Sequence, residues 1–148
     1  MRRMLAILSV TVLGGWSACA QEQAVKMKDL PPAVQKTVQE QTKGAVLKGL
    51  SKEVENGKTT YELETTVKGR SRDLLIDASG VVVEVEEEVA LDSIPPAAKA
   101  AIAKNAAGGK ITRVETVTRG KTTTYEAAIT KAGKSSEVAV AADGTIQK

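Results

Sequence analysis

The sequence lacks most of the side chains that carry out chemistry in proteins. It contains no histidine and a single cysteine, Cys19. Without histidine, the chain has neither the usual general base at neutral pH nor the commonest metal ligand. Because Cys19 has no second cysteine to pair with, no disulfide can form within the chain. We therefore expect a protein that is not an enzyme and needs no cofactor.

Aromatic residues are also scarce, with no phenylalanine, one tryptophan and two tyrosines. The core must be built from valine, isoleucine, leucine and alanine. A surface with so few aromatic side chains offers a poor cleft for sugars, although carboxylate pairs are plentiful. The 148 residues allow one domain of ordinary size or two very small ones.

The first 20 residues have the features of an export signal. Two arginines precede an apolar stretch, residues 4–13, that is too short to cross a membrane as a helix. Ala18 and Ala20 fit signal cleavage after Ala20, which predicts a periplasmic or secreted protein with no transmembrane segment in the mature chain. The alternative is lipidation at Cys19, although Trp16 is unusual three positions before a lipidated cysteine.

The basic charge of the whole chain comes largely from this signal. Removing residues 1–20 removes Arg2 and Arg3 but no acidic residue, which leaves 19 basic and 18 acidic side chains. A nearly neutral mature chain gives no reason to expect nucleic-acid binding.

An internal repeat organises the rest of the chain. The motif GKTTYEL at residues 57–63 returns as GKTTTYEA at residues 120–127, and Tyr125 follows Tyr61 by 64 residues. Both Pro-Pro pairs and several glycines keep the same offset. We interpret the chain as a tandem duplication, with one unit at residues 28–89 and the other at residues 91–148.

Each unit predicts one helix followed by a four-stranded antiparallel meander. The Pro-Pro pairs suit a first helical turn, and apolar residues follow at helical spacing. Alternating segments separated by glycine turns then predict strands, with residues 145–148 as the short fourth strand of the second unit. The expected fold class is α+β, with the helices packed on one face of the sheet. Since each unit alone has a small core, we expect the two to share a sheet or a core.

The tandem pattern resembles a known family. The segments LPPAVQKTV, GKTTYELE and DASGVVVEVEEE, followed by IPPAAKAAI, GKTTTYEA and AADGTI, are similar to the PepSY-like family, whose fold is also that of the bacterial β-lactamase inhibitor protein. The resemblance implies an exported bacterial module with an inhibitory or regulatory role. Inhibitors of that fold use an aromatic-rich sheet face and disulfides, which this chain lacks, so the resemblance does not imply β-lactamase inhibition.

The strongest candidate for a binding surface is acidic. Glu84, Glu86 and Glu88 alternate on one predicted strand, and Glu62 and Glu64 lie on the same face of another. Like charges that face one another on a sheet are unfavourable, and a basic partner or a cation would relieve them. We predict binding of a protein or peptide through this open face. The alternative is a divalent cation, calcium or magnesium, held by Glu84, Glu86 and Glu88. A solvated outer face without a ligand would have the same pattern.

The second unit predicts a smoother outer face. Ala128 stands where the first unit has Glu64, Ala139 lies on the same predicted face of the next strand, and small side chains allow the close approach of a partner. We therefore include Ala128 and Ala139 in the predicted partner-binding surface. Drift on an unconstrained surface is the alternative.

Overall fold

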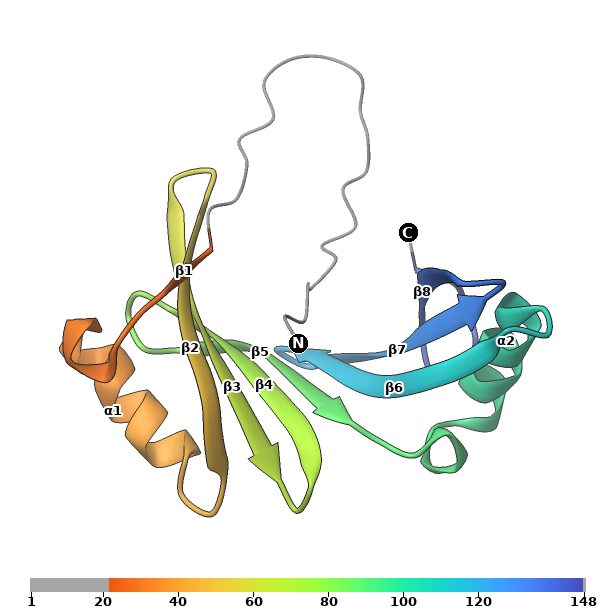
Figure 1. The fold of residues 1–148 in the computed structure, drawn as a ribbon, viewed down its shortest axis with the longest axis horizontal. Helices are drawn as coiled ribbons and strands as arrows, with labels where there is room; N and C mark the ends of the chain where they lie inside the picture. The colour runs from red at the N-terminus through yellow and green to blue at the C-terminus, as the bar shows by residue number, and fades with distance from the viewer. Residues whose placement is uncertain (1–21, 148) are drawn as a thin grey trace.

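The computed structural model describes residues 22–147, so the predicted signal at residues 1–20 and the candidate lipidation site Cys19 lie outside the described part. Within it, eight strands form one antiparallel sheet in sequence order, and two α-helices pack against it (Figure 1). This is an α+β fold dominated by its sheet, as predicted.

The first half of the chain is built on α1 (Pro32–Gln41). The helix follows a 3-10 turn, Met27–Asp29, and is followed by β2 (Val46–Glu55), β3 (Lys58–Val67), β4 (Arg70–Asp77) and β5 (Val82–Glu88). A two-residue strand, β1 (Gln23–Ala24), pairs with β2 at the edge. The buried cluster of this half consists of Leu30, Val34, Val38, Tyr61, Leu63, Leu74 and Ile76.

The second half repeats this order of elements from a 3-10 turn at Leu91–Ser93. The helix α2 (Pro96–Ala106) precedes β6 (Lys110–Arg119), β7 (Thr122–Lys131) and β8 (Lys134–Val140). The predicted fourth strand at residues 145–148 is wrong within the described residues: this segment makes one isolated bridge, Val140 to Ile146. The second cluster contains Ile94, Ala98, Ile102, Ala106, Val114, Ala127, Ile129, Val138 and Val140.

The two halves keep separate cores but share one sheet. The strands β5 and β6 pair from Val85–Thr118 to Glu88–Glu115, and this seam makes the sheet continuous. Of the two arrangements that the sequence allowed, a shared sheet or a shared core, the chain uses the shared sheet.

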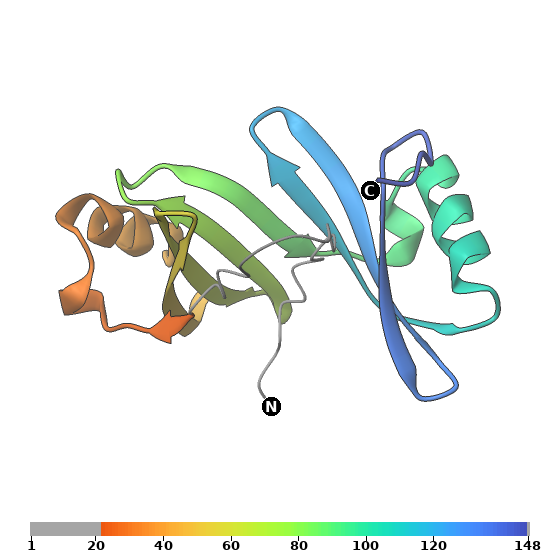
Figure 2. The ribbon, with the colours of Figure 1, turned by 90° about the horizontal axis from the view of Figure 1, so that it is seen from above.

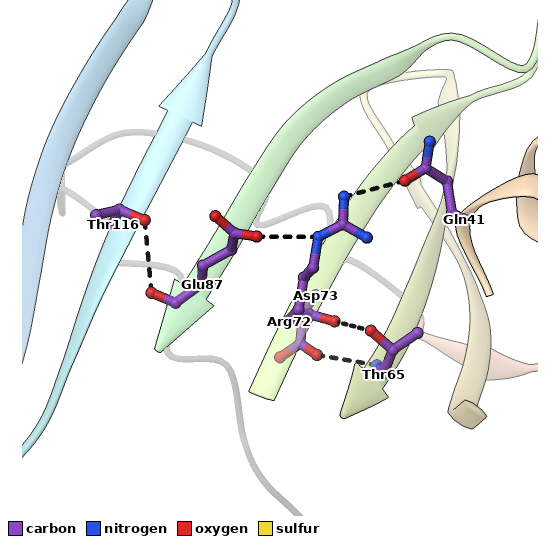
Figure 3. Close-up of polar contacts among 6 residues, drawn as sticks. All are labelled: Gln41, Thr65, Arg72, Asp73, Glu87 and Thr116. Atoms are coloured by element: carbon purple, nitrogen blue, oxygen red, sulfur yellow. Dashed lines mark hydrogen bonds and ion pairs between the residues drawn. The ribbon is translucent and has the colours of Figure 1, made fainter. Parts of the chain in front are cut away.

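The seam is reinforced on the helix-covered face of the sheet (Figure 3). Arg72 on β4 donates to the side chain of Gln41, which ends α1, at 3.0 Å, and to the carboxylate of Glu87 on β5 at 3.1 Å. The hydroxyl of Thr116 on β6 then donates to the backbone carbonyl of Glu87 at 3.5 Å. Polar side chains therefore link the first helix, β4, β5 and β6, the first strand of the second half.

Both helices cover the same face of the sheet, and within residues 22–147 no helix lies on the opposite face. The sheet bends between its halves, so that their helix-free faces turn toward one another while α1 and α2 lie on the outside (Figures 1 and 2). This helix-free face is therefore curved inward, with the β5–β6 seam at its centre.

Candidate functional site

Strand alternation places every predicted acidic site residue on the helix-free face. On β3, Tyr61 and Leu63 are buried under α1, so Glu62 and Glu64 point to the opposite side. On β5 the same alternation directs Glu84, Glu86 and Glu88 to the helix-free face. These five are the acidic residues of the predicted partner-binding surface, and they share one face of the sheet.

Cross-strand pairing arranges the carboxylates of this face in rows. One row crosses β3, β4 and β5 through Glu64, Asp73 and Glu86, and the second crosses β5, β6 and β7 through Glu88, Glu115 and Glu126. We call the following set the acidic face: Glu62, Glu64, Asp73, Glu84, Glu86, Glu88, Glu115 and Glu126. Like charges placed opposite each other on a sheet repel, so the face holds electrostatic strain.

Two arginines and two hydroxyls offset part of this charge. Arg113 lies 3.1 Å from the Glu115 carboxylate, and Arg119 pairs with Glu84. Ser71 donates to Glu88 at 3.2 Å, and Ser51 donates to Glu62 at 3.4 Å. Arg113 and Arg119 thus each form an ion pair with one carboxylate of the acidic face, and two further carboxylates accept hydrogen bonds from serine hydroxyls.

The centre of the face is shielded from water. Glu115 is 6% exposed and Val117, which pairs with Glu86 across the seam, is 1% exposed, although both lie on the face opposite α1 and α2. The inward bend and the surrounding side chains must therefore exclude solvent there. Carboxylates in such a place ionise less readily than in water.

This shielding raises the pKa of several carboxyls. The pKa of Glu86 is raised to about 8, first by burial and then by the hydrogen bond and charge of Glu84. Burial, with the charges of Glu64 and Asp73, raises the pKa of Glu62 to about 7.

The second acidic row behaves in the same way. Burial raises the pKa of Glu115, against the opposing charge of Arg113, and burial raises the pKa of Glu126, against Arg119. Of these carboxyls, Glu62 and Glu86 have pKa values near or above neutral pH, and a cationic group brought close to the acidic face would favour ionisation.

The predicted cation site finds no geometric support. Glu84, Glu86 and Glu88 follow one another along a single strand, and Glu84 and Glu88 are engaged by Arg119 and Ser71. Within residues 22–147, no group of three or more acidic side chains is placed to hold a metal ion. The acidic face is thus a distributed surface of charge.

The two predicted alanines also lie on the helix-free face, near its β8 edge. Ala139 pairs with Glu126, and Ala128 pairs with Glu137. The predicted smooth surface is therefore interrupted by carboxylates. Sequence reasoning missed three charged residues of this half, Arg113, Glu115 and Arg119, which β6 directs to the same face.

Two surface grooves lie away from the centre of the acidic face. One of about 440 Å³ borders the seam at the end of the β3–β4 hairpin and includes Arg72, Glu87 and Glu88 among its walls. The other, of about 550 Å³, lies beside α2 and is lined by Ala101, Lys104, Asn105, Gly144 and Ile146.

Solved structures share this fold at low sequence identity. A proposed periplasmic protein of Bacteroides eggerthii superposes with a TM-score of 0.66 at 15% identity, covering 80% of this chain and 86% of that one. A DUF2874 family protein of Bacteroides uniformis superposes with a TM-score of 0.64 at 19% identity, covering 80% of this chain and 86% of that one. A BLIP-like protein of Bacteroides fragilis superposes with a TM-score of 0.59 at 16% identity, covering 80% of this chain and 84% of that one. The fold is thus similar to that of BLIP-like proteins.

No family model matches the chain, and no curated protein is similar to it in sequence. Neither helix within residues 22–147 has the length and apolar character needed to cross a bilayer.

Proposed function

We propose that this protein is a non-catalytic, exported module that binds a protein or peptide partner through its helix-free sheet face. The partner presents lysine or arginine side chains to the acidic face. The observation that carries this proposal is the pair of carboxylate rows that meet across the β5–β6 seam, because their repulsion and raised pKa values are relieved by a basic surface.

The location of the protein is the periplasm or the cell exterior. This part of the proposal is supported by the export features of residues 1–20 and by the similarity in fold to a proposed periplasmic protein. The PepSY-like resemblance of the repeated motifs supports a regulatory role for the partner interaction.

We also infer that the two halves arose by duplication. Matching irregularities support this inference: each half has a β-bulge, between Leu47 and Gly49 in β2 and between Ile111 and Arg113 in β6, again 64 residues apart. A bulge inserts one extra residue into a strand and disrupts the ladder locally, and it is retained as a defined feature of a fold. Two bulges at one offset are most simply explained by a copied unit.

The interaction is tested with a carbodiimide, which joins a carboxylate to a lysine amine that lies in direct contact. The purified protein is treated with a periplasmic extract of the source bacterium, and joined peptides are identified by mass spectrometry. We expect joined positions at Glu62, Glu64 or Glu86 and weaker recovery of the same partner by the Glu64→Gln/Glu86→Gln variant.

The matched control is Glu40→Gln, which removes an exposed carboxylate on α1, on the outer side of the molecule. This variant should recover the partner as well as the unmodified protein does. Joined positions spread equally over Glu40 and the acidic face, or equal recovery by all variants, would show that the acidic face is only a solvated surface.

A further inference from the structure

Within residues 22–147, the last strand of the sheet, β8, is paired along its whole length on one side and only near its end on the other. Its inner side is bonded to β7 over the whole strand. On its outer side, the segment after the strand makes the bridge from Val140 to Ile146 and a 2.8 Å hydrogen bond from the Gln147 N–H to the Ala139 carbonyl. Within residues 22–147, no strand lies along the rest of this side.

The open part of β8 presents backbone groups in a regular pattern. Alternate residues of an antiparallel strand direct their N–H and C=O groups to the same side. Because the Ala139 carbonyl is bonded on the outer side, Glu137 and Ser135 also direct their backbone groups there. An added strand would find these donors and acceptors in register.

The first half of the chain shows what such a side accepts. The counterpart of β8 is β4, and its outer side is filled by β5, which begins with Val82 paired to Ile76. The bridge from Ile146 to Val140 lies 64 residues further on, so the second half begins the same pairing. After Val82, β5 continues past its bulge, and Val85 pairs with Leu74. In the second half, the counterpart of Leu74 is Val138. This continuation has no equivalent within residues 22–147.

A groove lies between α2 and the segment that follows β8. It has a volume of about 550 Å³ and runs between α2 and the segment that bridges to β8, with Ala101, Asn105 and Ile146 among its walls. In the first half, Val82 and Val85 of β5 pack against the buried cluster under α1. In the second half, Ile146 is 45% exposed. The groove thus has room for an aliphatic side chain from an added strand.

The charge of Glu137 favours a particular side chain at one position of an added strand. The residue of an added strand that follows the aliphatic position is placed opposite Glu137, as Glu86 is placed opposite Asp73 in the first half. Glu137 is exposed at the sheet edge, and a lysine or arginine opposite it forms a favourable cross-strand pair.

We propose that the outer side of β8 binds an extended segment of a partner protein by strand addition, and that this segment carries an aliphatic residue followed directly by lysine or arginine. The aliphatic side chain enters the groove beside α2, and the basic side chain pairs with Glu137. This surface is the edge of the sheet and is separate from the acidic face.

The probe is a seven-residue peptide with the sequence of residues 84–90, EVEEEVA, and a second form carrying Glu86→Lys. Each is titrated into the isotope-labelled protein while backbone amide shifts are recorded. We expect shifts at Ser135, Glu137 and Asn105, and binding of the lysine form about fivefold tighter than that of the glutamate form. The protein variant Glu137→Lys should reverse this preference.

Two further variants separate backbone pairing from side-chain charge. Glu137→Pro removes the outward N–H at a position where an edge strand tolerates proline, and it should weaken both peptides. Glu137→Ala keeps the N–H and should weaken only the lysine form. A circular dichroism melt of each variant establishes that the sheet is intact.

Several results overturn the proposal. These are the absence of shifts at millimolar peptide, shifts confined to the acidic face, or a preference that Glu137→Lys leaves unchanged. Concentration-dependent dimerisation through the same β8 amides would identify a second copy as the occupant and contradict the partner segment. Peptide binding by the Glu64→Gln/Glu86→Gln variant should equal that of the unmodified protein, so the two binding proposals fail independently.

Discussion

Gly80, in the turn between β4 and β5, lies directly against the first turn of α1 at Ala33. A Cβ at Gly80 would stand 2.7 Å from the carbonyl oxygen of Ala33, closer than such atoms approach. The hydroxyl of Thr37 on the same helix donates to the Gly80 carbonyl at 2.6 Å. The second half repeats the relationship, because a Cβ at Gly144 would stand 2.8 Å from the carbonyl oxygen of Ala97. The turn thus fixes how closely each helix approaches the sheet.

Gly80→Ala is therefore expected to destabilise the protein. The substitution adds a clash with helix backbone to the cost of a left-handed conformation, φ +87°, which L-residues rarely adopt. We expect a loss of about 2–4 kcal/mol in the free energy of unfolding, measured by urea denaturation.

Gly69→Ala is the matched control, because Gly69 has nearly the same φ, +85°, and open space where the Cβ would lie. It should cost only about 1 kcal/mol. If both variants lose the same free energy, the contact with Ala33 contributes nothing and only the backbone conformation matters.

Stability should fall as pH rises from about 4.5 to 8. Glu86 has a pKa of about 8 in the folded protein, against an ordinary value of 4.5, and Glu62 has a pKa of about 7. Between pH 4.5 and 8 the folded state therefore binds protons that the unfolded state has released. Linkage then requires the free energy of unfolding to decrease with rising pH over this window.

Glu86→Gln should flatten this dependence and stabilise the protein at pH 9. Because the Glu86 carboxyl is partly exposed and solvent screens its repulsion, we expect a gain of about 1–2 kcal/mol, well below what the full rise in pKa implies. Glu40→Gln, on the exposed surface of α1, should leave the slope unchanged. Urea midpoints at pH 5, 7 and 9 measure both, and equal slopes for the two variants would contradict a shielded Glu86.

Much of the fold was predictable because its signals are local. Pro-Pro pairs begin both helices, and glycine turns with regular alternation define the strands of the first half. Alternation correctly placed Tyr61 and Leu63 in the core and Glu62 on the other face. Each of these inferences needs only neighbouring residues.

The composition of the acidic face was harder to predict. The pairing of β5 with β6 joins segments separated by α2, and strand sequences alone do not specify that neighbour. In β6, a bulge between Ile111 and Arg113 interrupts the alternation, so that Ile111 and Val114 both pack toward α2. Without the bulge, the side to which Glu115 points cannot be assigned, and the second carboxylate row was therefore missed.

Arg72 should couple energetically to Glu87. The Arg72 side chain is 23% exposed and that of Glu87 is 52% exposed, and Arg72 also connects β5 with the end of α1 (Figure 3). The burial of the arginine makes this pair less screened than a pair with both members on the open surface. A double-mutant cycle with Arg72→Met and Glu87→Gln should give a coupling of about 0.5–1 kcal/mol.

Lys28 and Asp29 provide the comparison, since their side chains are 76% and 49% exposed. A cycle with Lys28→Met and Asp29→Asn should give a coupling near zero. A coupling for Arg72 and Glu87 that is no larger would mean that the polar links across the seam add little to its stability.

Substitutions at Ala139 should separate charge from contact on the helix-free face. Ala139 pairs with Glu126, whose pKa is raised by burial, so a second carboxylate beside it increases repulsion. At pH 8, we expect Ala139→Glu to destabilise the protein by about 0.5–1 kcal/mol and Ala139→Lys to stabilise it by a similar amount. Ala100, exposed on α2, should tolerate both substitutions equally.

Partner recovery after carbodiimide treatment then decides what the two alanines do. If the partner lies close against Ala128 and Ala139, any large side chain there weakens recovery, so Ala128→Glu and Ala139→Lys reduce it alike although they have opposite charge. If the face acts through charge alone, only the lysine variant loses the partner, because it neutralises the carboxylates that a basic surface requires. Unchanged recovery by both would leave Ala128 and Ala139 outside the contact and restrict it to the two acidic rows.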